Sequence, residues 1–216
     1  IETVTYMLAG EFEHKDSTGG EGRMTAGDVQ WMKTGSGIIH SEMPAMKEGK
    51  LHGFQLWINM PASLKMSKPE YHYIDANEMS VHHDEDKKIK VIAGKFENAE
   101  GPIKKHNVEP IFFDVELKQN KQFSFSIPKS HNSFVYLVDG RIKIGNLSHD
   151  NIEGSKLVLL TNGNNLKVSA ETNAKFLLIA GEPIGESIAR GGPFVMNTKS
   201  EIIQAINDYN NGTFVR

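Results

Sequence analysis

The chain consists largely of short runs in which hydrophobic and polar residues alternate, and most of these runs end at Gly, Asn or Pro. Successive residues of a β-strand face opposite sides, so this pattern favours strands. Eight runs stand out by their β-branched and aromatic content: residues 3–8, 54–59, 90–93, 111–117, 123–127, 134–138, 156–160 and 175–180. Many short strands separated by turn residues indicate an all-β sandwich or barrel.

One segment near the C-terminus has the pattern of a helix instead. Thr198 and Glu201 have the spacing of a capping box, in which each side chain satisfies a backbone N–H of the other residue. Apolar residues follow on one side of the expected helix: Ile202, Ile203, Ala205, Ile206 and Tyr209. Residues 210–212 (Asn-Asn-Gly) supply a stop signal, so we expect one short helix here.

The strand pattern occurs twice along the chain. Residues 2–10 align with residues 132–140, and residues 54–61 align with residues 176–183, in the same order. This order favours two copies of one β-unit over a chance similarity of strands that end at Gly and Pro. We expect a first domain over residues 1–75, a second over residues 76–190 and a C-terminal segment with the helix over residues 191–216. A polar join near residues 75–89 would connect the two domains.

The two copies differ at their beginnings. Residues 91–131 precede the second copy of the opening strand, whereas only Ile1 precedes the first copy at Glu2. Strands without neighbours would expose unpaired edges. We therefore expect that the first barrel is incomplete in this sequence and lacks its opening strands.

Composition narrows the classes of function. The 24 Lys and Arg residues against 27 Asp and Glu residues give a net charge of −3, which argues against direct nucleic-acid binding by phosphate neutralisation. The chain has no Cys, so thiolate catalysis and Cys-ligated zinc are excluded. No apolar run approaches the roughly 20 residues of a membrane span. We expect no membrane association and a cytoplasmic location, with the nucleus as a second location in a eukaryote.

The segment from Gly27 to Glu42 carries the candidate chemistry. His40 and Glu42 are two residues apart, so on a strand both side chains project from the same face. An imidazole and a carboxylate, with one or two further His, suit non-haem Fe(II) or another divalent transition metal. A weak surface pair is the alternative for an isolated His-x-Glu. The repeat places His40 opposite Lys167 and Glu42 opposite Ser169, so a metal would bind only in the first copy.

Four segments together closely resemble the pirin family: residues 27–44, 52–59, 179–183 and 192–198. The resemblance spans both halves of the chain and implies two tandem cupin domains, which are antiparallel jelly-roll β-barrels, the second without metal. It also implies one iron held by three His and one Glu, of which two match His40 and Glu42. The other two His would form a His-x-His pair just upstream of Ile1. Glu2 matches the glutamate of the general cupin motif and is a candidate for supporting the ligands.

The resemblance further implies a non-haem iron dioxygenase that cleaves quercetin-type flavonols to a depside with release of carbon monoxide. Glu42 would then serve as the catalytic base as well as a ligand, while His40 stays on the metal. Two alternatives remain open. One is a non-catalytic regulator whose iron state controls binding to transcription factors or metabolic enzymes, and the other is a structural bicupin that binds no metal.

Other residues near the motif carry weaker expectations. His14 lies in a predicted hairpin and is expected to face solvent, and His82 and His83 are expected to be solvated in the polar join. For Gln55, a place in a cavity wall and a half-exposed strand position are equally compatible with the pattern. Met side chains and Trp31 cluster around the motif, which favours an apolar cavity for a small aromatic ligand.

Overall fold

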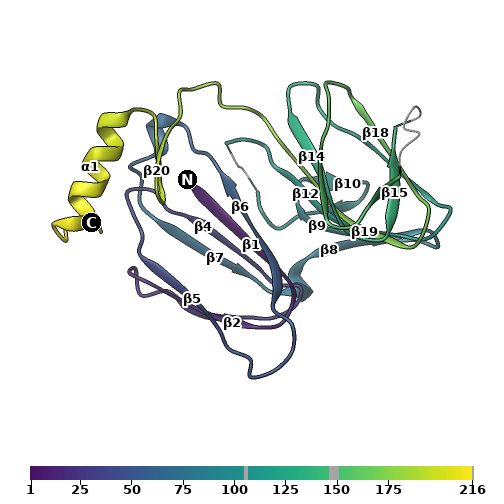
Figure 1. The fold of residues 1–216 in the computed structure, drawn as a ribbon, viewed down its shortest axis with the longest axis horizontal. Helices are drawn as coiled ribbons and strands as arrows, with labels where there is room; N and C mark the ends of the chain where they lie inside the picture. The colour runs from purple at the N-terminus through teal and green to yellow at the C-terminus, as the bar shows by residue number, and fades with distance from the viewer. Residues whose placement is uncertain (105–106, 146–150, 216) are drawn as a thin grey trace. The chain divides into compact units, whose positions relative to one another are not determined.

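The computed structural model describes residues 1–104, 107–145 and 151–215. The chain forms two compact units (Figure 1). Unit 1 combines residues 1–78 with the C-terminal residues from 184 onward, and unit 2 covers residues 79–183. The C-terminal segment therefore packs with the N-terminal barrel, while the domain boundaries expected from the sequence remain a prediction.

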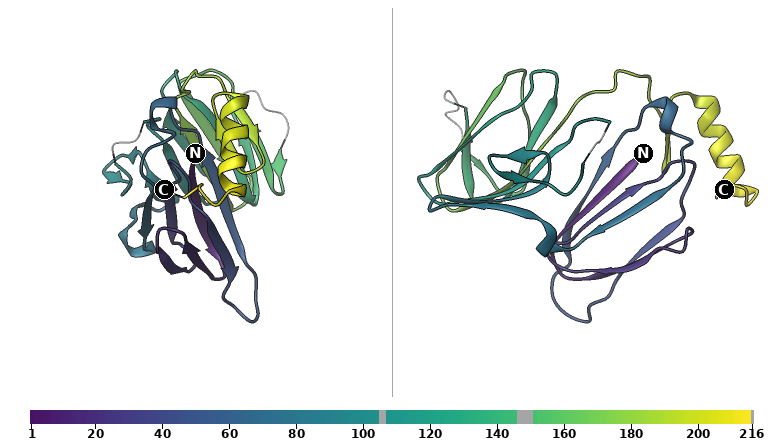
Figure 2. Two further views of the ribbon diagram at one scale, coloured as in Figure 1. Left: turned by 90° about the vertical axis from the view of Figure 1, so that its left-hand side faces the viewer. Right: turned by 180° about the vertical axis from the view of Figure 1, so that it is seen from behind.

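Unit 1 is built from antiparallel strands in two larger sheets and one hairpin. The first sheet has the order β6-β1-β4-β7 and the second the order β3-β2-β5, and β20 pairs with β21. Figure 2 shows the β2 and β5 strands lying across from the sheet that contains β1, β4 and β6. The elements of unit 1 are β1 (Glu2–Ala9), β2 (Phe12–Asp16), β3 (Glu21–Met24), β4 (Val29–Lys33), β5 (His40–Pro44), β6 (His52–Ile58), η1 (Ala62–Leu64), β7 (Glu70–Ile74), η2 (Ala76–Glu78), β20 (Ala189–Gly191), β21 (Phe194–Met196) and α1 (Lys199–Asn210).

Unit 2 repeats this two-sheet plan around an apolar core. Its larger sheet has the order β17-β14-β19-β12-β9-β8, its smaller one the order β13-β18-β15-β16, and β10 pairs with β11. Phe96, Phe113, Phe123, Phe125 and Phe176 pack against one another inside it. The strands are β8 (Ser80–His83), β9 (Lys87–Ala93), β10 (Lys95–Phe96), β11 (Ala99–Glu100), β12 (Ile111–Leu117), β13 (Gln122–Ser126), β14 (Asn132–Asp139), β15 (Arg141–Ile144), β16 (Ile152–Glu153), β17 (Lys156–Leu159), β18 (Asn165–Ala170) and β19 (Ala174–Gly181).

The predicted all-β fold with two cupin-like barrels and one C-terminal helix is confirmed. β1 pairs with β6 and β14 with β19, and each pair has a register shift close to its end. Gly10 and Gly140 follow the two equivalent strands with φ of +83° and +87°. A Cβ at either position would collide with a backbone carbonyl, of Lys50 and Asn173 respectively, so both turns require Gly.

One local expectation is corrected and another is confirmed. The polar join near residues 75–89 is not a simple solvated loop, because β8 and the start of β9 lie there. Helix α1 has the predicted capping box between Thr198 and Glu201, but its apolar face is only partly buried. Ile202 is buried, whereas Ile203, Ile206 and Tyr209 are exposed.

Candidate metal site

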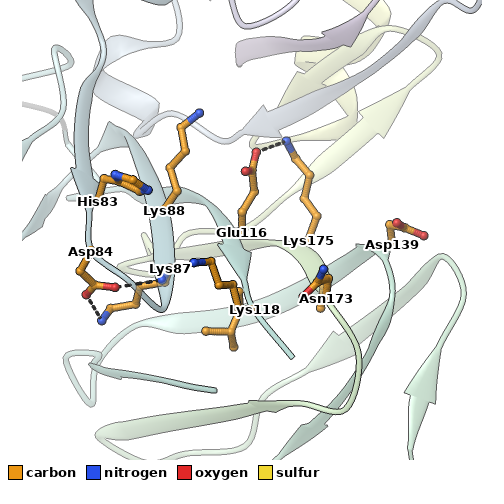
Figure 3. Close-up of a pocket in the computed structure, with 11 residues that line it drawn as sticks. His83, Asp84, Lys87, Lys88, Glu116, Lys118, Asp139, Asn173 and Lys175 are labelled. Carbon is orange, nitrogen blue, oxygen red and sulfur yellow. Dashed lines mark hydrogen bonds and ion pairs between the residues drawn. The ribbon is translucent and has the colours of Figure 1, made fainter. Parts of the chain in front are cut away.

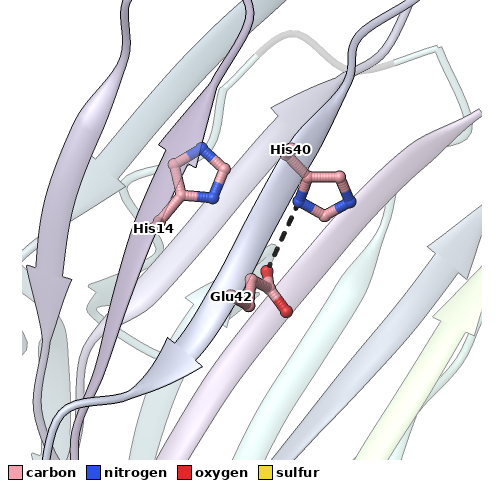
Figure 4. A group of neighbouring side chains, drawn as sticks. All are labelled: His14, His40 and Glu42. Carbon is pink, nitrogen blue, oxygen red and sulfur yellow. Dashed lines mark ion pairs between the residues drawn. The ribbon is translucent and has the colours of Figure 1, made fainter.

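Strand β5 brings His40 and Glu42 together, as expected for two alternate residues of one strand. Their side chains project from the same face, and the Nδ1 atom of His40 lies 3.9 Å from Oε1 of Glu42 (Figure 4). Both side chains are partly accessible, at 30% and 26% of their full exposure. The strand geometry therefore allows both groups to reach one ion, and their role as ligands stays a proposal.

His14 supplies a third donor, contrary to the expectation that it faces solvent. Its residue is 0% exposed, and in the β2–β5 ladder it lies directly opposite Glu42. Donor atoms of His14, His40 and Glu42 all lie within 4.8 Å of one another. The sequence does contain one indication that His14 is buried, because residues alternate along β2 and His14 therefore shares a face with the buried Phe12.

Asp16 holds the His14 ring in place. Its Oδ2 atom lies 2.9 Å from Nε2 of His14, and both side chains are fully buried. Burial alone would raise the pKa of Asp16, but hydrogen bonds from Thr18, His14 and Gly20 outweigh burial and lower this pKa. An ionised carboxylate accepts, so we place the His14 proton on Nε2. The Nδ1 atom of His14 is then a buried acceptor, and it has no hydrogen-bond partner among the described residues.

Two amides approach the Glu42 carboxylate from the opposite sheet. Nε2 of Gln30, on β4, donates to Oε1 of Glu42 at 3.1 Å. Nε2 of Gln55, on β6, lies 3.5 and 3.4 Å from the two oxygens of Glu42. Gln30 and Gln55 are both opposite Thr5 of β1, so they form one row across the sheet. Amide groups on two strands thus hold the position of the Glu42 carboxylate.

A cavity of about 570 Å³ adjoins this cluster within unit 1. His40, Gln55 and Trp57 line it from the barrel side. The C-terminal segment contributes an aromatic wall in which Phe194, Tyr209 and Phe214 contact one another. The rest of the lining combines the charged Lys65, Glu201 and Asp208 and several small polar residues with apolar side chains, among them Met32, Ile38, Ile39, Met66, Val195 and Met196. A cavity with aromatic walls and a few polar groups suits a small, flat organic ligand.

Lys65 ties the C-terminal segment to the barrel beside this cavity. Its residue is 2% exposed, and its Nζ atom donates to Oδ1 of Asn59 at 2.6 Å and to the carbonyl of Val195 at 3.0 Å. Burial lowers the pKa of Lys65, an effect opposed by the charges of Glu186 and Glu201. The contact to Val195 fixes β21 as part of the cavity wall.

The equivalent place in unit 2 is apolar. The strand pair β15–β18 is the counterpart of β2–β5, because residues of β2 correspond to residues 130 positions later in β15. Ile144, which lies opposite Val168, is therefore the counterpart of His14, and Val168 is the counterpart of Glu42. This pairing differs by one residue from the alignment expected from the sequence. Leu166, rather than Lys167, corresponds to His40, and Val168, rather than Ser169, to Glu42. Apolar side chains offer no ligand atoms at this place.

Glu2, the candidate supporting residue, lies outside the cluster. Thr3 and Thr5 of β1 face the Gln30–Gln55 row, so Glu2 belongs to the other face of the strand. There its Oε2 atom accepts a hydrogen bond from Nε1 of Trp31 at 2.6 Å. Glu2 therefore supports the buried side of the sheet and not the metal ligands.

His52 and His82 also lie outside this cluster. His52 shares the face of Phe54, opposite to Gln55. His82 lies on β8 in unit 2, with its ring nitrogens 3.1 Å from Asp84 and 3.2 Å from Glu97. None of the metal-donor clusters found among the described residues includes them.

A second cavity, of about 360 Å³, lies in unit 2 and has a charged lining (Figure 3). Lys87 pairs with Asp84 at 2.5 Å, and Lys175 pairs with Glu116 at 3.3 Å. Lys175 also lies 3.0 Å from the buried Asp114. Several charged side chains of this wall are thus paired with one another. The described residues of this lining include no Phe, Tyr or Trp, in contrast to the first cavity.

Within the described part of the chain, no helix combines the length and hydrophobicity needed to cross a membrane.

Both halves of the chain are similar to known protein families. Residues 1–58 match the family described as Pirin, and residues 112–215 match the Pirin C-terminal cupin domain. A pirin-like protein of Caulobacter vibrioides is 41% identical over 216 residues, which are 99% of this chain and 77% of that protein.

Two crystal structures share the fold. A quercetin 2,3-dioxygenase from Acinetobacter baumannii is 34% identical, with a TM-score of 0.92 over 99% of this chain and 75% of that chain. A bacterial pirin from Escherichia coli in complex with nickel(II) is 24% identical, with a TM-score of 0.66 over 84% of this chain and 72% of that chain. Taken with the matches of both halves, the 41% identity over nearly the whole chain shows that this protein belongs to the pirin family.

Proposed function

We propose that this protein is a metal-dependent dioxygenase that acts on small, flat aromatic substrates of the flavonol class. The observation that carries the proposal is the position of His40, which belongs both to the three-donor cluster and to the lining of the aromatic cavity. A ligand in this cavity would lie beside a bound ion. The similarity to a quercetin 2,3-dioxygenase at 34% identity supports the same assignment.

The donor set suits a divalent transition metal. Two imidazoles and one carboxylate are the ligands of many non-haem Fe(II) oxygenases, in which open positions remain for substrate. His14, His40 and Glu42 would hold the ion, and the buried Nδ1 atom of His14 would gain the partner that it lacks in the described structure. The two further His expected upstream of Ile1 remain a prediction.

Different residues of the site would have different roles in the reaction. When bound, the metal would polarise a substrate oxygen as a Lewis acid. Glu42, held in position by the Gln30 amide, would accept the proton of the substrate hydroxyl group. The aromatic wall would hold the substrate rings and exclude water. In flavonol cleavage both atoms of dioxygen enter the depside, and one carbon of the heterocyclic ring leaves as carbon monoxide.

Oxygen uptake tests the proposal. Protein that is first loaded with Fe(II) under anaerobic conditions and then mixed with quercetin in aerated buffer should consume dioxygen, and His40→Ala should abolish the uptake. His72→Ala is the matched control, because this His is more than half exposed on β7 and is not among the cavity-lining residues. Iron binding without oxygen uptake by the wild-type protein would reject the dioxygenase and favour the iron-dependent regulator.

A further inference from the structure

A chain of hydrogen bonds leads from the cavity wall to the Glu42 carboxylate. Nε1 of Trp57 donates to Oε1 of Gln55 at 3.1 Å, and Nε2 of Gln55 lies 3.4 Å from Oε2 of Glu42. Gln55 and Trp57 are alternate residues of β6 and share the face that lines the cavity. The Gln55 amide therefore contacts both the cavity wall and a candidate metal ligand.

The chemistry of Trp57, Gln55 and Glu42 fixes which group donates and which accepts in these hydrogen bonds. An indole N–H can only donate, so it turns the oxygen of the Gln55 amide toward Trp57. The NH2 group of Gln55 then faces Glu42, and it also donates to Oγ1 of Thr5 at 3.3 Å. Only a side chain with a donor and an acceptor at its end can make both contacts.

Gln30 contacts the same carboxylate without reaching the cavity. It is 0% exposed, donates to Glu42 at 3.1 Å, and accepts from the hydroxyl of Tyr71 at 3.3 Å. Gln30 does not line the cavity, whereas Gln55 does. The two amides thus have equal chemistry and different surroundings.

We propose that Gln55 is a positioning residue that couples the occupancy of the cavity to the Glu42 carboxylate. A flat aromatic ligand with a hydrogen-bond acceptor near Trp57 would take the indole N–H and free the Gln55 amide to turn. The donation to Glu42 would then change, and with it the hold of Glu42 on a metal. By reciprocity, a change at Glu42 alters the indole of Trp57. The coupling to a metal rests on the proposed function, whereas the link between Glu42 and Trp57 does not.

The indole N–H resonances in a nitrogen–proton correlation spectrum measure this link. The chain has only two Trp residues, and Trp57→Phe assigns the two signals. Glu42→Gln should shift the Trp57 signal in the wild-type background and in Gln30→Met. In Gln55→Met the same substitution should leave the signal in place. An equal shift in Gln55→Met, or no shift in the wild-type background, would overturn the proposal.

Zinc titration extends the test to the metal. Zn(II) that binds the wild-type protein, as measured by calorimetry, should also shift the Trp57 signal, and this shift should be lost in Gln55→Met. Binding with an unmoved Trp57 signal would overturn the coupling but leave the metal site intact. A lack of any zinc binding would argue against the proposed function, and the Glu42→Gln comparison would still decide on Gln55.

Discussion

At the scale of single residues, the groups of the candidate site keep little freedom. Asp16 fixes one nitrogen of His14, and Gln30 and Gln55 flank the carboxylate of Glu42. A buried polar atom without a partner costs roughly 1–3 kcal/mol. The Nδ1 atom of His14 has no such partner among the described residues. A bound cation would supply one, and this is the physical reason to include His14 among the ligands.

Asp16→Asn tests that role of His14. We expect the affinity for Fe(II) to fall by roughly tenfold, because a supporting carboxylate orients a His ligand and raises its basicity. Anaerobic Fe(II) titration measures the change, and circular dichroism checks that the barrel is folded. Thr18→Val, which removes one of the donors to Asp16, is the control and should have a smaller effect. An unchanged affinity in a folded Asp16→Asn protein would show that Asp16 has only a structural role.

Single residues of the site were predictable from the sequence to different degrees. The spacing of His40 and Glu42 was sufficient, because alternate residues share a strand face whatever the sheet packs against. His14 was missed because alternation along β2 places it on the face of Phe12 but does not say that this face is buried, which depends on β5 pairing beside β2, a contact between distant segments. Gln30 was missed because it lies in a buried run from Val29 to Met32 that shows no alternation.

At the scale of elements, the β8–β9 turn shows how charged residues can form ordered strands. Oδ1 of Asp84 accepts from the backbone N–H groups of Asp86 and Lys87 at 2.8 and 2.9 Å. Oδ2 lies near the side chains of Lys87 and His82. The charge density that suggested a solvated join therefore stabilises a hairpin. The sequence pattern could not show this, because the contacts depend on the turn geometry.

Asp84→Asn should lower stability in a pH-dependent way. Hydrogen bonds from Lys87 and His82, with that of the Asp86 N–H, hold the pKa of Asp84 well below its usual range. Its stabilisation is therefore present above the ordinary carboxyl pKa of about 4 and is lost as the pH falls through the folded-state value. We expect a Tm lower by roughly 3 °C at pH 7, with the difference narrowing toward pH 3. A difference that is constant over this range would contradict the assignment.

At the scale of the whole molecule, one β-unit occurs twice with two different interiors. In unit 2 the positions equivalent to the site are Ile144, Leu166 and Val168, which belong to an apolar core. In unit 1 the same positions are His14, His40 and Glu42 beside an aromatic cavity. The duplication and the fold were predictable from strand order, since these depend on local patterns. The cavity was only suggested by the Met cluster, because the C-terminal segment that forms its wall is distant in sequence.

The most direct test of this account is an anaerobic Fe(II) titration by calorimetry of the wild-type protein, His40→Ala and His83→Ala. His83 lies in unit 2 and lines the charged cavity, so its substitution is the matched control. We predict one ion bound by the wild-type and His83→Ala proteins with equal affinity, and a loss of at least about tenfold in His40→Ala. Equal binding by all three proteins, or no binding by any, would contradict a metal site formed by His14, His40 and Glu42.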